Sequence, residues 1–198
     1  MMFPAHVYWL LKYYGLQNVQ VLNGGIEAWK AKGYPVSSSP VVPEVTNIFS
    51  IILKYTLIFK KLGNFKAEVN SKLLIPFEQF QQLITDNNKS SNVNILDCRP
   101  RDQYLTEARK LFNLDDSVKG CHVKNSKSLP ALELVSGNGV NPQEEANFAN
   151  DKPIITYCAT GNQASLTLLI LSYYGISNIA VFQGGMTEFV RRSGKDLE

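Results

Sequence analysis

The stretch best suited to chemistry is residues 153–165, which read PIITYCATGNQAS. A short apolar and β-branched run ends at Cys158, small and polar residues follow, and an apolar helical pattern begins at Leu166. We therefore expect a strand, a tight loop that starts with Cys158, and a helix. Backbone N–H groups and the helix dipole favour an anion at such a place, so they would stabilise a thiolate nucleophile. The alternative interpretation is a small buried hydrophobe at a strand end, as free cysteines often are.

The elements that must position this loop alternate between strands and helices. The sequence predicts strands at 19–22, 73–75, 93–97, 153–157 and 179–182, and helices at 7–14, 26–31, 77–84, 99–106, 131–135, 142–148, 164–174 and 186–192. This alternation predicts an α/β fold, a doubly wound parallel sheet with helices on both faces. Ligands of such sheets bind beyond the carboxyl ends of the strands, where Asp97 and Cys158 both fall.

An internal repeat divides the chain. Residues 11–25 match residues 171–185 without a gap, so that Leu11 aligns with Leu171, an offset that has the size of a domain. The positions that recur identically are Leu11, Tyr13, Tyr14, Gly15, Asn18, Val21, Gly24 and Gly25. We therefore expect residues 1–40 to be the end of a first domain, residues 41–64 a linker with an apolar insertion, and residues 65–198 a complete second copy. The isolated first piece must dock on the second domain, pair with another chain or stay marginally stable.

Composition and charge exclude several classes of function. A net charge of +3 over 198 residues is too weak to indicate a nucleic-acid partner, and the most apolar stretch, residues 48–59, is too short to span a bilayer. Three widely spaced cysteines, Cys98, Cys121 and Cys158, favour a reducing compartment, the cytoplasm or the mitochondrion, over a disulfide framework. The N-terminus lacks the features of a signal peptide. No cluster of His and Cys indicates a metal, and we expect no cofactor.

Four motifs in this order resemble the rhodanese superfamily, and specifically its tandem-domain thiosulfate/3-mercaptopyruvate sulfurtransferases. They are ILDCR at 95–99, a degraded GCHVKNSKSLP motif at 120–130, CATGNQA at 158–164, and the twice-repeated pattern of YYG, N, V and GG. The resemblance implies a rhodanese-like fold and sulfur transfer through a persulfide on Cys158. The implied partners are a small sulfur donor, thiosulfate or 3-mercaptopyruvate, and an acceptor such as cyanide, a thiol or a thioredoxin-like reductant.

The resemblance also implies which residues bind the donor. The catalytic residue is Cys158, and the loop residues whose N–H groups would cradle the transferred sulfur are Ala159, Thr160, Gly161, Asn162 and Gln163. Ala159 and Thr160 resemble the small residue and the hydroxyl of relatives that prefer mercaptopyruvate, although Thr160 could equally cap the following helix. Phosphatases related to this family have a loop one residue longer that carries an arginine. Here no arginine occurs between Cys158 and Arg191, which argues against phosphate chemistry.

Two arginines are candidates for holding the donor's charge. Arg99 would bind a donor carboxylate, or else it would be solvated or pair with Asp97. The family's second arginine aligns with Gln103, and Arg101 is a weak substitute for it.

Three other residues of the aligned motifs are given structural roles. His122 matches the family histidine and is expected to form a structural hydrogen bond. Cys98 and Cys121 are expected in the core.

One departure from the family favours a second function class. In mercaptopyruvate enzymes of this type, a histidine and an aspartate of the first domain complete the site, and neither is present in this sequence. We therefore expect activity impaired by truncation, and the alternative function is a catalytically weak or inactive module that binds or regulates a partner. The role of the apolar segment 45–62 stays open between a covering helix, an interfacial helix and an insertion.

Overall fold

The computed structural model describes residues 2–39, 65–115, 118–135, 142–149, 151–193 and 197–198. Two compact units make up the chain: Met1–Val21 together with Glu68–Glu198, and Leu22–Ala67. The predicted division at residues 40 and 64 rests on the repeat and stays a prediction. The apolar segment 45–62 lies outside the described residues.

The larger unit is built on a parallel sheet whose strands run in the order β2–β1–β3–β4. The strands are β1 (Asn94–Asp97), β2 (Ser126–Ser128), β3 (Ile154–Tyr157) and β4 (Ile179–Val181). In the register of β1 and β3, Asp97 lies opposite Tyr157. The residues that follow these two strands therefore leave the sheet at the same edge, which brings the segments after Asp97 and Tyr157 together.

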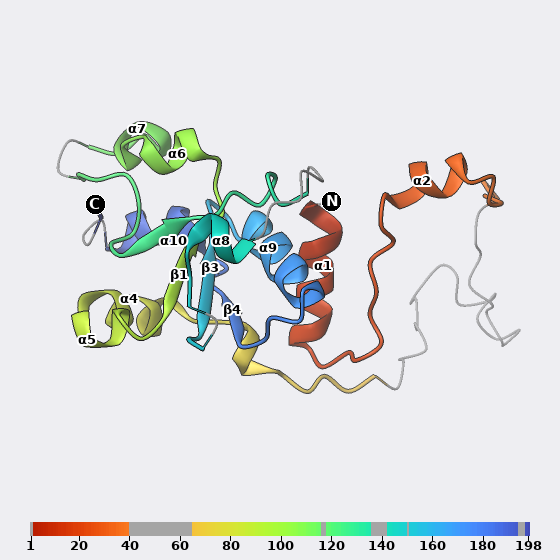
Figure 1. The fold of residues 1–198 in the computed structure, drawn as a ribbon, viewed down its shortest axis with the longest axis horizontal. Coiled ribbons are helices and arrows are strands. Elements are labelled where there is room, and N and C mark those ends of the chain that lie inside the picture. The colour runs from red at the N-terminus through yellow and green to blue at the C-terminus, as the bar shows by residue number, and fades with distance from the viewer. Residues whose placement is uncertain (1, 40–64, 116–117, 136–141, 150, 194–196) are drawn as a thin grey trace, which may run out of the picture. The chain divides into compact units, whose positions relative to one another are not determined.

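Helices surround this sheet (Figure 1). They are α1 (Met2–Tyr13), the 3₁₀ turn η1 (Ser71–Leu73), α4 (Phe77–Thr85), α5 (Asn87–Ser90), α6 (Arg101–Leu105), α7 (Ala108–Phe112), α8 (Pro142–Ala146), α9 (Asn162–Tyr173) and α10 (Gly185–Arg192).

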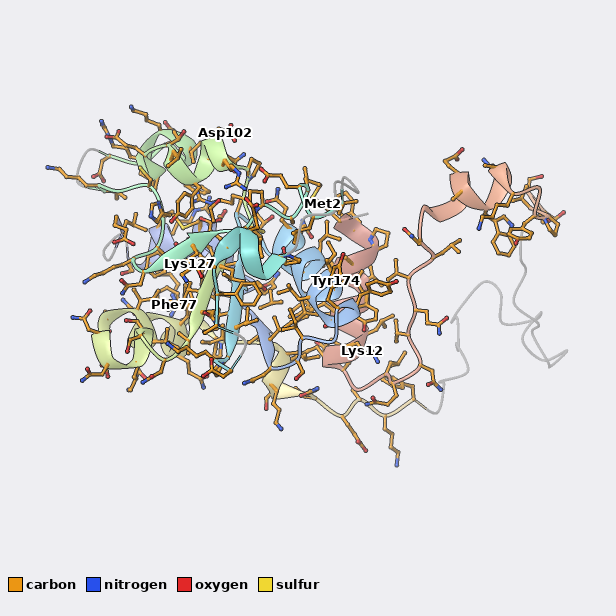
Figure 2. The ribbon with its side chains drawn as sticks, in the orientation of Figure 1. Met2, Lys12, Phe77, Asp102, Lys127 and Tyr174 are labelled. Carbon is orange, nitrogen blue, oxygen red and sulfur yellow. The ribbon has the colours of Figure 1, made fainter. Side chains whose placement is uncertain are left out.

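Adjacent residues of each central strand pack on opposite faces of the sheet. Leu96 and Ile154 belong to one buried cluster together with apolar side chains of α9 and α1. Ile95 and Ile155 belong to a second cluster, formed with side chains of α4 and α10. Side chains accordingly fill the space on both sides of the sheet (Figure 2). The fold is therefore the predicted α/β arrangement, with a parallel sheet that is covered on both faces.

Helix α1, which lies in the predicted end of a first domain, packs on α9. Ala5 and Trp9 are buried in this contact, and the Trp9 Nε1–H donates a 2.8 Å hydrogen bond to the carbonyl oxygen of Leu73. Of the three fates expected for the isolated piece, the structure shows docking on the second domain for this helix.

The smaller unit contains α2 (Gly25–Ala31), in which no residue is buried. The Trp29 and Tyr34 rings lie 4.6 Å apart, and the Trp29 Nε1–H donates to the Pro35 carbonyl oxygen at 2.9 Å. Among the described residues of this unit, this ring contact and hydrogen bond join α2 to the segment that follows it.

Several predicted elements differ in the structure. Residues 19–22 form no strand, and residues 131–135 are turns rather than a helix. The predicted strand 73–75 is reduced to η1 followed by a single bridge between Leu74 and Val181. Strand β2 was not predicted, because its sequence Ser-Lys-Ser carries no apolar signal and only its edge pairing with β1 makes it a strand.

Phe80 is the centre of the α4 side of the core and generates the first prediction. Its ring is fully buried and lies 4.3 Å from the Phe182 ring and 5.9 Å from the Phe189 ring. Phe80→Ala should therefore lower the free energy of unfolding by about 3–5 kcal/mol, through lost burial and the cavity left behind. Urea denaturation measures this value. The control is Tyr173→Ala, an exposed ring whose loss should change it by less than about 0.5 kcal/mol. Equal effects of the two changes would contradict this packing.

Candidate active site

Cys158 is the first residue after β3, and α9 begins four residues later with Gly161 as its N-cap. The loop between them curls, so that the backbone N–H of Gly161 donates a hydrogen bond to the Cys158 sulfur at 3.1 Å. The strand, loop and helix expected around this cysteine are therefore confirmed. Cys158 is only 1% exposed, so the loop encloses the sulfur closely.

Two glycines allow the loop and the start of α10 to approach each other. Gly161 has a φ of +86°, and a Cβ atom built on it would lie 2.6 Å from the Gln183 carbonyl oxygen. Gly185 also has a positive φ, and its Cβ would overlap the carbonyl oxygens of Cys158 and Ala159. These same carbonyls accept hydrogen bonds from α10, Cys158 from the Met186 N–H at 2.8 Å and Ala159 from the Thr187 N–H at 3.1 Å. The loop is therefore held from outside by the backbone of α10.

Ser165 ties the loop to α1 from the other side. Its buried hydroxyl donates to the Gly161 carbonyl at 2.8 Å and lies 3.1 Å from the Nδ1 atom of His6. A serine hydroxyl has one proton, and the bond to Gly161 uses it, so His6 must donate from Nδ1. Burial lowers the pKa of His6, which favours its neutral form. Through Ser165, helix α1 thus supports Gly161, whose N–H contacts the cysteine sulfur.

Arg99 is fully buried in an ion pair with Asp97. Its Nη2 lies 2.6 Å from Asp97 Oδ2, its Nε lies 2.9 Å from the same oxygen, and Nη2 also donates to the Cys121 carbonyl at 3.1 Å. Its Nη1 has no hydrogen-bond partner among the described residues. Of the interpretations of Arg99, the structure shows the pair with Asp97, which leaves no exposed guanidinium for a donor carboxylate. A direct role in donor binding stays a prediction.

Arg101 is likewise engaged. It forms ion pairs with Glu133, at 2.7 Å, and with Glu145, all on the exposed side of α6. The two arginines that sequence reasoning offered for the donor's charge therefore both carry carboxylate partners.

The remaining motif residues have structural positions. Cys98 is fully buried, as expected, and burial raises the pKa of its thiol well above the ordinary value, so it stays neutral. Cys121 is only half-buried, so the expectation of a core position is wrong for this residue. The His122 ring stacks on Tyr104 at 3.7 Å, and its Nδ1 lies 3.0 Å from the Tyr104 carbonyl oxygen, which fits the expected structural role.

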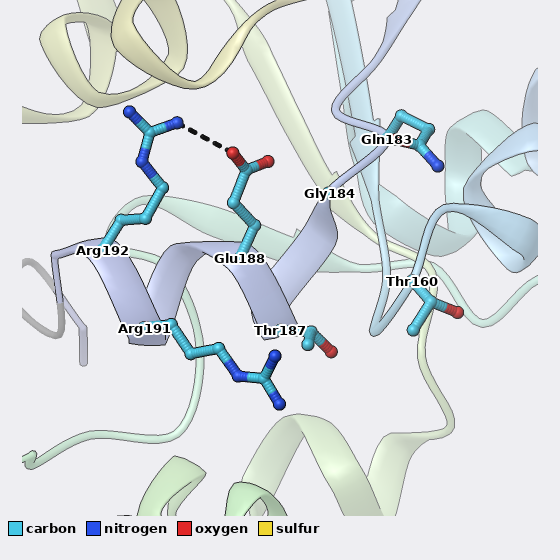
Figure 3. Close-up of a pocket in the computed structure, with 7 residues that line it drawn as sticks. All are labelled: Thr160, Gln183, Gly184, Thr187, Glu188, Arg191 and Arg192. Atoms are coloured by element: carbon cyan, nitrogen blue, oxygen red, sulfur yellow. Dashed lines mark hydrogen bonds and ion pairs between the residues drawn. The ribbon is translucent and has the colours of Figure 1, made fainter.

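A cavity of about 340 Å³ opens beside the loop (Figure 3). Its lining residues are Thr160, Gln183, Gly184, Thr187, Glu188, Arg191 and Arg192. Thr160 comes from the cysteine loop. Gln183 and Gly184 directly precede α10, and the other four residues belong to that helix. Sequence reasoning named Thr160 and missed the rest. The spacing of four residues between Thr187 and Arg191, one helical turn, is the signal that could have indicated them.

Residues 77–192 match the model of the rhodanese-like domain, and the chain belongs to this family. The matched region contains β1, the cysteine loop and α10. The expected resemblance to the rhodanese superfamily is therefore confirmed.

Among curated proteins, the chain is 28% identical to the putative thiosulfate sulfurtransferase mpst-1 of Caenorhabditis elegans, over all of this chain and 60% of that protein. It is 27% identical to the thiosulfate sulfurtransferase of Mus musculus, over 96% of this chain and 59% of that protein. The chain thus spans about three fifths of the length of the relatives that it matches.

Solved structures agree on the fold. The 3-mercaptopyruvate sulfotransferase SseA of Escherichia coli superposes with a TM-score of 0.65 at 22% identity, over 91% of this chain and 61% of that chain. The Tum1 protein of Saccharomyces cerevisiae superposes with a TM-score of 0.67 at 18% identity, over 96% of this chain and 63% of that chain.

No group of three or more His, Cys, Asp and Glu residues is placed to hold a metal ion within the described part of the chain. No helix among the residues with a described structure has the length and apolar character needed to cross a membrane.

The close approach at Gly161 generates the second prediction. Gly161→Ala adds a left-handed φ cost, roughly 1–2 kcal/mol, and a clash with Gln183, whereas Gly175→Ala adds only the φ cost, because nothing lies within 4 Å of its Cβ position. The free energy of unfolding should therefore fall by at least about 1 kcal/mol more for Gly161→Ala. Chemical denaturation of both variants measures the difference. Equal losses would mean that the backbone contact at Gly161 is dispensable.

The buried ion pair generates the third prediction. Asp97→Asn leaves the Arg99 charge buried without its partner, so the free energy of unfolding should fall by about 3–5 kcal/mol. The double variant Asp97→Leu with Arg99→Met should recover much of this loss, because it removes both charges. The control is Glu133→Gln, which affects a half-exposed pair with Arg101 and should cost no more than about 1 kcal/mol. Asp97→Asn behaving like this control in urea denaturation would count against a structural role for Arg99.

Proposed function

We propose that the chain is a sulfurtransferase that moves a sulfur atom from thiosulfate or 3-mercaptopyruvate through a persulfide on Cys158 to a thiol or cyanide. The observation that carries the proposal is the Cys158 sulfur at the end of β3, held at 3.1 Å by the N–H of Gly161 where α9 begins. The names of the relatives support the donor class, thiosulfate for the curated proteins and 3-mercaptopyruvate for the bacterial structure.

The chemistry balances without an added oxidant. The Cys158 thiolate attacks the outer sulfur of thiosulfate, the sulfur–sulfur bond of the donor breaks, and sulfite leaves with the electron pair. With mercaptopyruvate the carbon–sulfur bond breaks instead, and the thiol proton ends on the enolate carbon to give pyruvate. In both reactions a persulfide anion forms on Cys158. Hydrogen bonds from backbone N–H groups to this anion would stabilise it more than they stabilise a neutral thiol.

The burial of Cys158 restricts which donors fit. Both proposed donors carry their transferable sulfur at a terminus, so this one atom can enter the loop while the charged remainder stays outside. The acceptor must reach the persulfide in the same way. A small nucleophile such as cyanide or a projecting thiol, including the exposed cysteine of a thioredoxin-like reductant, satisfies this requirement. All three cysteines are free thiols, which suits a reducing compartment, the cytoplasm or the mitochondrion.

A second candidate function is a weakly active or inactive module that binds or regulates a partner. Two observations favour it: Cys158 is only 1% exposed, and the two predicted donor-binding arginines already carry carboxylate partners. The two candidates differ in whether turnover depends on Cys158.

The fourth prediction concerns the nucleophile. Cys158→Ser should abolish thiocyanate formation from cyanide with either donor, because serine forms no persulfide, while Cys121→Ser, which removes a half-buried thiol, should retain it. Colorimetric thiocyanate assays measure the rates, and mass spectrometry of the donor-treated wild-type protein should find one added sulfur on the peptide that contains Cys158. Equal rates for wild type and Cys158→Ser would remove the enzyme and leave the binding module.

A further inference from the structure

An anionic donor needs a cation near the loop, and the cations expected from the sequence are engaged elsewhere. Arg99 is fully buried against Asp97, and Arg101 carries Glu133 and Glu145. Both guanidinium charges are therefore largely neutralised. The question is which other positive side chain faces the open space beside the cysteine loop.

The cavity beside the loop contains two arginines with different partners. Arg192 is paired with Glu188 at 2.8 Å and Glu78 at 2.6 Å, and its guanidinium lies 3.7 Å above the Phe77 ring. Arg191 is exposed and makes no hydrogen bond or ion pair with another residue of the described part of the chain. Figure 3 shows the Arg191 side chain on the side of Thr187, away from the Arg192–Glu188 pair. Arg191 therefore brings to the cavity a positive charge that no described residue pairs with.

Helix α10 couples this charge to the loop. The N–H of Thr187 donates to the Ala159 carbonyl, and Arg191 follows Thr187 by one helical turn on the same face. The hydroxyls of Thr160 and Thr187 line the same cavity. A small anion in this space would therefore meet a guanidinium and two hydroxyl groups next to the residues that enclose the Cys158 sulfur.

We propose that Arg191 is the residue that binds the charged group of the sulfur donor, the sulfonate of thiosulfate or the carboxylate of a mercapto acid, in the cavity between the cysteine loop and α10. The donor identity rests on the proposed function. In this arrangement the terminal sulfur points toward Cys158 while the anionic group stays in the cavity. The N–H groups of a guanidinium can donate two parallel hydrogen bonds, and each of these anionic groups offers two oxygen atoms to accept them. Arg191 thus determines donor specificity in place of Arg99 and Arg101.

The test measures donor affinity in two ways. The first is the KM for thiosulfate in the thiocyanate assay, for wild type, Arg191→Gln, Arg191→Lys and the control Lys72→Gln. The second is a thiosulfate titration of ¹⁵N-labelled Cys158→Ser protein, with and without Arg191→Gln, in which the amide signals of Thr160 and Thr187 are followed by NMR. The second measurement requires no turnover.

Lys72 is a matched control for the loss of one positive charge. It is exposed, and it precedes the bridge between Leu74 and Val181, in which the two segments run parallel. Lys72 therefore lies toward the sheet edge opposite the loop, so its charge should not contribute to donor binding.

We expect Arg191→Gln to raise the KM for thiosulfate about tenfold, with Arg191→Lys in between and Lys72→Gln within about twofold of wild type. Thiosulfate should shift the Thr160 and Thr187 signals only when Arg191 is present. Persulfide formation with an unchanged KM and unchanged shifts in Arg191→Gln would overturn this inference and leave the proposed function intact. Shifts that depend on Arg191, in a protein that forms no persulfide, would support the anion site and refute the sulfurtransferase.

Discussion

The site depends on a close backbone approach between the cysteine loop and the segment that leads from β4 into α10. Gly161 meets the Gln183 carbonyl, and Gly185 meets the carbonyls of Cys158 and Ala159, with no side chain between the two segments at either contact. The N–H groups of Met186 and Thr187 then bond to the loop carbonyls, which turns the Gly161 N–H inward to the sulfur. A loop that was not held in this way could extend and would lose its contact with the sulfur. Helix α10 is therefore part of the site although it carries no nucleophile.

Much of the fold follows from local sequence signals. The sequences of particular segments show why the other elements were predicted wrongly or missed. Strands β1 and β3 each contain two adjacent buried aliphatic residues, and α9 begins after a short run of small and polar residues and continues as an apolar segment, so these elements were predictable. Strand β2 has a polar sequence and exists because β1 offers an unpaired edge, which is a tertiary effect. The first-copy sequence at 19–22 resembles β4 yet forms no strand. This segment therefore has the residue pattern of a strand but pairs with no strand among the described residues.

The position of the candidate site could be predicted from the sequence around Cys158, but the ion pairs of the arginines could not. The residue types around Cys158 indicate a loop at a helix start, because small residues and glycine between a strand and a helical pattern are typical of a tight turn. The carboxylate that pairs with an arginine cannot be predicted from the local sequence in the same way, because it depends on which side chains the fold brings close together. Arg99 follows Asp97 by two residues, and the buried geometry joins them, whereas Glu133 and Glu145 reach Arg101 from distant positions in the chain. That Arg191 has no charged partner among the residues with a described structure can be recognised only when these pairs are known.

The contact of α1 with α9 joins two segments that lie far apart in the sequence. Ala5 and Trp9 of α1 are buried with α9, and His6 reaches Ser165, which bonds to the cysteine loop. Residues Met1–Val21 accordingly belong to the same compact unit as Glu68–Glu198, whereas Leu22–Ala67 forms the other unit. The unit that contains the cysteine loop is therefore discontinuous along the chain, and an N-terminal helix acts as a buttress for a loop that follows it by about 150 residues.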